Sequence, residues 1–208
     1  MNSRAFTLIE LLVVIAIVSL MSAFVLGSFS RSTQEAGVAE ATNSLLSFMR
    51  KARQNAVSVL EHPGQPGVYP SYGIHINIKD DPGKIILYAD CKADDNDSGG
   101  IEASDIFHFR QSECNGNGKI EELKLNNAHV TSLVFSGANP NESGALTSFN
   151  VLFIRPEPTV WFSGTTGPVA HPHVKNFDVG EARITISNLA GTESKVIRIN
   201  SVGLIVIE

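Results

Sequence analysis

The sequence has no excess of basic residues. Its 16 lysines and arginines are outnumbered by 21 aspartates and glutamates, which gives a formal net charge of −5. A protein that binds nucleic acid through its phosphates needs a basic surface. The composition therefore gives no support to that class of function, and we expect no nucleic-acid partner.

The sequence also lacks the signatures of several enzyme classes. It contains no nucleophile elbow, no phosphate-binding glycine loop and no zinc-protease helix motif. His171 and His173 could face one side of an extended segment, but no third metal ligand accompanies them, so a surface pair is the preferred interpretation. Trp161 and Phe162 are interpreted as core residues. We predict that the protein is not an enzyme.

The chain does contain a long apolar run near its N-terminus. From Phe6 to Leu26 there are 21 residues, and Glu10 is the only ionisable one. As a helix this run is about 31 Å long, which matches the hydrocarbon core of a bilayer. It predicts a membrane-spanning helix; a secretory signal peptide is the alternative, although its apolar part is usually shorter. Arg4 favours a cytoplasmic N-terminus.

Glu10 is the unusual residue of this run. A carboxylate at the centre of the hydrocarbon costs about 2.5–3.5 kcal/mol on insertion scales. A partner of opposite charge would offset part of that cost. We therefore expect that something compensates the charge of Glu10; a glutamate tolerated near the membrane surface is the alternative.

A second, amphipathic helix is predicted over residues 30–62. Apolar residues recur there at gaps of three and four, which is helical spacing; they are Val38, Ala41, Leu45, Phe48, Ala52, Ala56 and Val59. The other face carries Glu40, Asn43, Arg50, Arg53 and Gln54, and Pro63 and Gly64 end the pattern. If the two helices are continuous, one helix of about 84 Å runs from Phe6 to Glu61, and its first half must protrude from a small domain.

From residue 67 onward the pattern changes to alternation with many β-branched residues, which predicts strands. The expected strands lie at 72–79, 84–90, 106–110, 130–137, 149–156, 182–188 and 195–208, the last as a hairpin turning near Gly203. The turn Asp80-Asp81-Pro82-Gly83 joins the first two. The expected fold class is α+β: a long N-terminal helix packed on an antiparallel β-sheet head that spans 67–208.

The stretch "RAFTLIELLVVIAIVSLM" resembles the signal segment of type IV pilins and type II secretion pseudopilins. The resemblance implies that prepilin peptidase removes a leader of residues 1–5 by cutting between Ala5 and Phe6. Phe6 is then methylated, and residues 6–29 form the helix of the filament core. Ala5 stands where the family usually has glycine. Glu10 holds the position of the glutamate that pairs with the terminal amine of a neighbouring subunit.

Two further stretches, "LSFMRKARQNAVSV" and "VIRINSVGLIVIE", resemble minor subunits of these filaments. The resemblance implies a structural minor pilin or pseudopilin; a major filament subunit, or a calcium-dependent adhesin or DNA-uptake subunit at a filament tip, are the alternatives. DNA-binding minor pilins carry a basic Gly-Arg-x-Arg stretch, whereas residues 203–206 here read Gly-Leu-Ile-Val.

The resemblance also implies partners and a location. The partners are other pilin or pseudopilin subunits, prepilin peptidase and the inner-membrane assembly platform. The protein is expected in the bacterial inner membrane, crossing it once with a cytoplasmic N-terminus and a periplasmic or extracellular head, and in the filament after assembly.

An acidic stretch, "DDNDSGGIEASD", has the spacing of a calcium loop. With Asp94 at the first place, oxygen donors fall at the third, fifth, ninth and twelfth places, Gly99 allows the sharp turn, and the seventh place offers a backbone carbonyl. The candidate ligands are Asp94, Asn96, Ser98, Gly100, Glu102 and Asp105. The loop resembles those of dockerin-like modules. A solvated acidic turn is the alternative.

Cys91 and Cys114, the only two cysteines, lie close to this loop. Outside the cytoplasm they could pair, and a disulfide there would contribute about 3 kcal/mol by constraining the unfolded chain; two reduced thiols are the alternative. A second loop at 113–124 repeats part of the ligand pattern, but Lys124 occupies its last place, where a cation is repelled.

Overall fold

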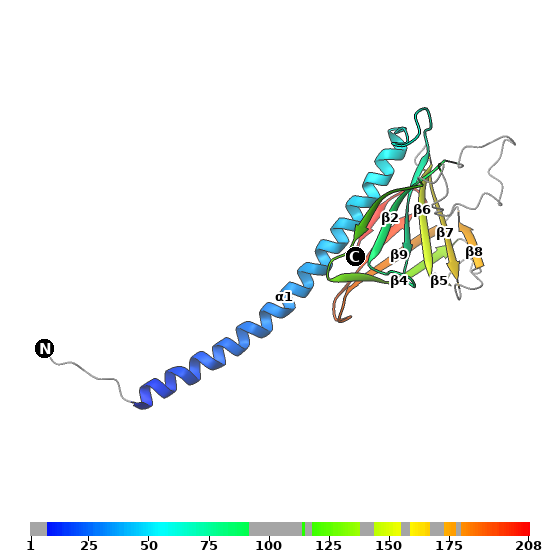
Figure 1. Cartoon of the computed structure of the whole chain (residues 1–208). Coiled ribbons are helices and arrows are strands. Elements are labelled where there is room, and N and C mark those ends of the chain that lie inside the picture. Colours follow the sequence, from blue (N-terminus) through cyan, green and yellow to red (C-terminus); the bar gives the residue numbers. More distant parts are fainter. Residues whose placement is uncertain are drawn as a thin grey trace.

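The structure is a computed structural model that describes residues 8–91, 114, 118–137, 144–154, 159–166, 173–177 and 180–208, without the side chains of 25–31, 159 and 173–177. These residues form one long helix and eleven strands. The helix projects from a head in which all the strands lie (Figure 1). The predicted α+β class is confirmed.

Helix α1 (Leu8–Val57) is continuous over 50 residues, about 75 Å. Its two halves have different surroundings. The side chains from Leu8 to Phe24 are exposed, whereas a stripe from Val38 onward is buried in the head. The buried stripe contains Val38, Ala41, Leu45, Phe48, Met49, Ala52 and Ala56, as its helical spacing predicts. Thr42 is also buried there, and its hydroxyl has a hydrogen-bond partner because it donates to the Val38 carbonyl at 2.7 Å.

The helix ends earlier than the predicted Glu61 or 62. Val59 has a φ of 48°, the Leu60 amide donates to the Asn55 carbonyl, and the Val59 amide donates to the Ala56 carbonyl. This is the Schellman arrangement, whose left-handed position is usually glycine. The prediction of a helix over 30–62 was wrong at its end because a β-branched residue gives no sign of that conformation.

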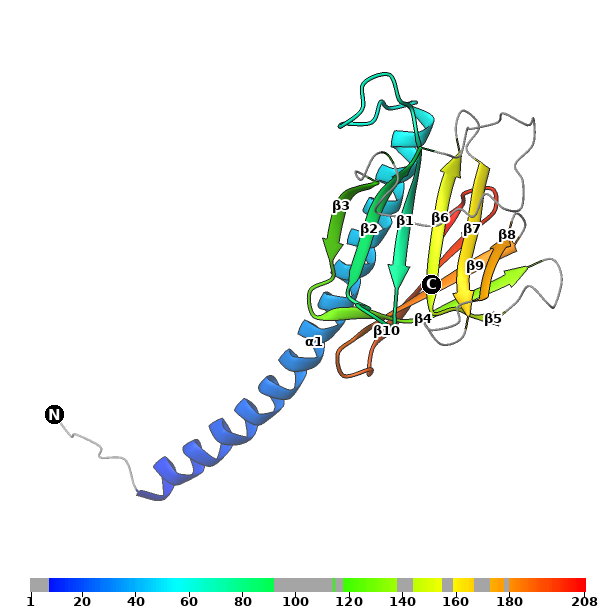
Figure 2. The ribbon, with the colours of Figure 1, turned by 45° about the vertical axis from the view of Figure 1, so that its right-hand side comes forward.

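The strands form two antiparallel sheets where one was expected. The first sheet has the order β3 (Lys119–Lys124), β2 (Lys84–Asp90), β1 (Ser71–Asn77), β6 (Ser148–Ile154), β7 (Thr159–Thr166) and β8 (His173–Phe177). The second has the order β11 (Ile205–Ile207), β10 (Ser194–Asn200), β9 (Gly180–Asn188), β4 (Ala128–Gly137) and β5 (Gly144–Ala145). Figure 2 shows the first sheet lying across α1.

The core lies between the two sheets and the second half of α1. Phe135 of β4 packs against Phe162 of β7 across the sheets, with ring centroids 5.5 Å apart. Phe149 stacks on Phe162 within the first sheet at 5.7 Å. The helix contacts strands of both sheets, so its orientation relative to the head is set from two sides.

Several strands agree with the sequence prediction. β2 has the predicted bounds, β1, β4, β6 and β9 lie within two residues of theirs, and β10 and β11 form the expected hairpin, with Gly203 at a φ of 81°. The predicted strand at 106–110 lies outside the described residues. Strands β3, β5, β7 and β8 were not predicted.

Candidate functional site

The first half of α1 presents apolar side chains on every side. From Leu8 to Phe24 all side chains are exposed, including Leu8 at 81% and Phe24 at 79%. A helix that is apolar all round is normally surrounded by protein or lipid. Two polar residues satisfy themselves locally, because the hydroxyls of Ser19 and Ser22 donate to the carbonyls of Ile15 and Val18, each at 2.8 Å. This surface is therefore suited to an apolar environment.

Among the residues that the structure describes, no helix meets the length and hydropathy needed to cross a membrane.

Glu10 lies in the first turn of α1 and is exposed. At that end of a helix the backbone N–H groups carry a partial positive charge, which favours a carboxylate by about 0.3–1 kcal/mol. Glu10 is the acidic residue of an otherwise apolar surface. Ala5 and Phe6, the predicted processing residues, lie outside the described part of the chain.

The predicted cysteine pair is confirmed. Cys91, directly after β2, and Cys114 form a disulfide with their Cα atoms 5.5 Å apart. His62, from the turn after α1, lies beside them: one of its ring nitrogens and the two Sγ atoms are all within 4.8 Å of one another. His62 and Cys114 are buried.

The acidic loop from Asp94 to Asp105 lies outside the described residues, so the calcium prediction is not tested. Of the second loop, residues 119–124 form β3. Lys124 is exposed there, and Glu122 accepts hydrogen bonds from Lys119 at 2.5 Å and lies 3.2 Å from Lys84. The bonds from Lys119 and Lys84 lower the pKa of Glu122. The second half of this segment is thus committed to pairing with β2.

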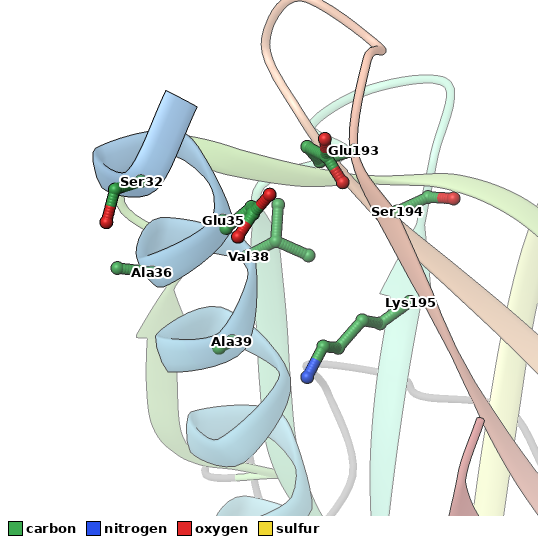
Figure 3. A pocket seen from close by; sticks show the side chains of 8 residues that line it. All are labelled: Ser32, Glu35, Ala36, Val38, Ala39, Glu193, Ser194 and Lys195. Atoms are coloured by element: carbon green, nitrogen blue, oxygen red, sulfur yellow. The ribbon is translucent and has the colours of Figure 1, made fainter. Parts of the chain in front are cut away.

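A groove of about 490 Å³ lies where α1 leaves the head (Figure 3). Glu35, Ala36 and Ala39 line it from the helix, Glu193 lines it from the turn before β10, and Lys195 lines it from β10 itself. Lys195 extends toward the helix (Figure 3). The turn that precedes β10 is held to the helix at this point, since Asn188 and Thr192 donate to the Gln34 side chain at 3.0 and 3.2 Å.

The outer face of the first sheet carries a polar row, in which Asn150 and Ser163 are buried and His75 is half-buried. His75 lies 2.7 Å from the Asn150 side-chain oxygen, and the Asn150 amide donates to Ser163 at 3.0 Å. Burial lowers the pKa of His75, an effect that the Asn150 bond and the charge of Asp80 partly oppose. Because Asn150 separates the imidazole from the hydroxyl, this row is not a nucleophile and base in contact. His171 lies outside the described residues, and His173 is placed only by its backbone in β8.

The N-terminal segment matches a family model. Residues 1–26 match the prokaryotic N-terminal methylation motif. The match supports a relation to type IV pilins and pseudopilins and covers the N-terminal segment of the chain. The motif implies a membrane-anchored precursor that prepilin peptidase processes and that assembles with other pilins, and it is a structural motif rather than that of an enzyme family. No curated protein and no solved structure is significantly similar to the chain.

Sequence reasoning missed three contacts in the β-rich head and where the helix joins it. His62 beside the disulfide, the groove at Lys195 and the row through Asn150 each join residues distant in the chain. The one available signal was the alternation of β1 and β6, which places His75 and Asn150 on the face opposite Ile74 and Val151.

Proposed function

We propose that the protein is a minor pilin or pseudopilin, a structural subunit added to a type IV pilus or a type II secretion pseudopilus. The observation that carries the proposal is the methylation motif at residues 1–26. It is continuous with an exposed apolar helix that ends in a compact β-rich head. A subunit of this shape can bury its helix among other helices and leave its head at the surface.

In this proposal prepilin peptidase cuts between Ala5 and Phe6, and Phe6 is methylated. The apolar run from Phe6 to Leu26 anchors the precursor in the inner membrane, with its head outside the cytoplasm, until the assembly platform transfers it. The run is 21 residues long. It extends two residues beyond each end of the segment from Leu8 to Phe24, whose side chains the structure describes. Mass spectrometry of the mature chain should find methylated Phe6 as the first residue. An N-terminus elsewhere contradicts the processing site.

Glu10 is proposed as the assembly residue, which pairs with the terminal amine of a neighbouring subunit. A carboxylate and an ammonium brought together in an apolar filament core offset part of each other's desolvation. Glu10→Ala should therefore leave membrane insertion intact, or ease it, and reduce the amount of this subunit in sheared filaments. Ser19→Ala, about two turns and a half further along the same exposed half of the helix, is the matched control. Equal incorporation of the two variants would contradict the role of Glu10.

We also propose that the acidic loop binds calcium through Asp94, Asn96, Ser98, Gly100, Glu102 and Asp105. The support is the donor set, because a hard cation takes six to eight oxygens and tolerates irregular geometry. Calcium would then stabilise the head without taking part in chemistry.

A further inference from the structure

The residues around the disulfide come from three separate parts of the chain. His62 lies in the turn after α1, Cys91 follows β2, and Cys114 lies 23 positions further on. One ring nitrogen and two sulfur atoms lie within 4.8 Å of one another. It is the one group of three or more such ligands found among the described residues.

Hydrogen bonds within its own loop also hold His62 in place. Its amide N–H donates to the Val68 carbonyl at 2.8 Å, and its carbonyl accepts from the Gln65 amide at 3.1 Å. The Gly64 amide donates to ring atom Nδ1 at 3.0 Å. These bonds close a short loop that holds the imidazole, 2% exposed, against the sulfur atoms.

We propose that the protein binds one zinc ion through His62, Cys91 and Cys114 when the disulfide is reduced. Thiolate sulfur and imidazole nitrogen are the ligands that zinc prefers, and three protein ligands with a water in the fourth position are a common zinc arrangement. Cys91 is half-buried, so a water molecule can reach the metal from its side. The oxidised protein has no such site, because a disulfide offers no thiolate.

Reduction of the disulfide supplies the two thiols that zinc binds. A phosphine reductant gives two electrons to the disulfide and becomes a phosphine oxide with oxygen from water, whose two protons complete the two thiols. Zinc then binds both sulfur atoms and releases both thiol protons. It also binds His62, either directly at Nδ1 or at the other nitrogen after a tautomer change that protonates Nδ1. In both cases the Gly64 amide loses its bond to the ring.

The test uses the full chain in detergent, reduced with a phosphine, and Co²⁺ as a spectroscopic probe. Reduced wild type should show thiolate-to-cobalt absorption at one equivalent of metal, the oxidised protein should show none, and zinc should displace the cobalt. His62→Ala should weaken zinc binding about 100-fold, since loss of a residue that only orients a ligand already costs 10–100-fold. His129→Ala is the matched control and should bind as wild type does.

Two further measurements address the state of the fold. Zinc should slow alkylation of Cys91 and Cys114 in the reduced wild type but not in His62→Ala, and the Gly64 amide resonance should shift when zinc binds. The proposal is overturned if reduced wild type shows no cobalt–thiolate band, including the case in which reduction unfolds the chain. It is equally overturned if His62→Ala binds zinc as tightly as wild type.

Discussion

The Tyr88 ring lies over Gly73, its direct partner on the neighbouring strand. The two residues pair in the β1–β2 register, and a Cβ atom added to Gly73 would come within 2.7 Å of Cζ of that ring. Tyr88 then packs with Leu152, Ile154 and Trp161 on the outer face of the first sheet. A glycine at the centre of a strand, which normally weakens a sheet, here makes room for an aromatic side chain.

Gly73→Ala should therefore destabilise the head. The added carbon would also meet the Val151 backbone carbonyl at 2.6 Å, and a backbone in the middle of a sheet cannot move away. We expect a loss of about 1–3 kcal/mol in the free energy of unfolding, the range for overpacked sites, measured by denaturant unfolding in detergent. Gly37→Ala is the matched control: it lies in α1 with its nearest new contact at 3.8 Å and should stabilise the chain by about 0.5–1 kcal/mol. Equal effects of both substitutions would contradict the packing argument.

Val59→Gly should stabilise the protein. Val59 is in the left-handed region at a φ of 48°, which costs an ordinary residue about 1–2 kcal/mol. Its side chain lies at the surface, outside the buried stripe of α1. After the entropic cost of a glycine we expect a gain of about 0.5–1 kcal/mol and a melting temperature higher by about 1–4 °C. Val59→Ala keeps the Cβ atom and should give no comparable gain. A lower melting temperature for the glycine variant would show that the Val59 side chain contributes packing.

The stability of the head should decrease in acid through His75. Burial lowers the pKa of this imidazole below its ordinary value of 6.5 in the folded chain, so the unfolded chain takes up the proton first as the pH falls. The free energy of unfolding therefore keeps the full contribution of neutral His75 above pH 6.5. Below that pH the contribution is lost progressively, by at most about 1.4 kcal/mol per pH unit. His75→Gln should flatten this part of the stability profile between pH 7.5 and 5.5, measured by thermal melts. A profile as steep as that of wild type would assign the effect to other groups.

Calcium should raise the melting temperature of the full chain relative to chelator. A ligand that binds only the folded state stabilises it by about 2.7 kcal/mol at a hundredfold excess over its dissociation constant. Asp94→Ala and Asp105→Ala should each remove most of the shift, whereas Asp97→Ala, at a loop place without a ligand, should retain it. Magnesium should do less, because it requires octahedral geometry. Coincident melts in calcium and chelator would mean that the stretch is only an acidic turn.

Local signals explain which parts of the fold were predictable. The bounds of β2 follow from alternation and from the Pro82-Gly83 turn. The buried stripe of α1 follows from helical spacing in the same way. Strand β3 does not, because its six residues are mostly charged and become a strand by pairing with β2, where Lys84 reaches Glu122. The separation into two sheets depends on which strands pair, and periodicity does not report that.

The candidate sites also differ in whether they rest on local sequence signals or on contacts between distant residues. The cysteine pair and the N-terminal motif could be recognised because they rest on residue types and spacing. His62 could not be assigned to the disulfide, since only the turn that follows α1 brings it there. Glu10 is placed at the start of an exposed apolar helix, but its partner would belong to another subunit.

The continuity of α1 determines how this protein would respond to tension. A pull on the first half of the helix is carried along a single rod of about 75 Å into a stripe of side chains enclosed by both sheets. The load is then parallel to the packed face, so the contacts of Leu45, Met49 and Ala52 resist sliding together instead of separating one after another. The disulfide and the bonds between Gln34 and the β9–β10 turn lie toward opposite ends of this face. Force on the helix therefore acts as shear on its packed face, and the head holds the helix through many contacts at once.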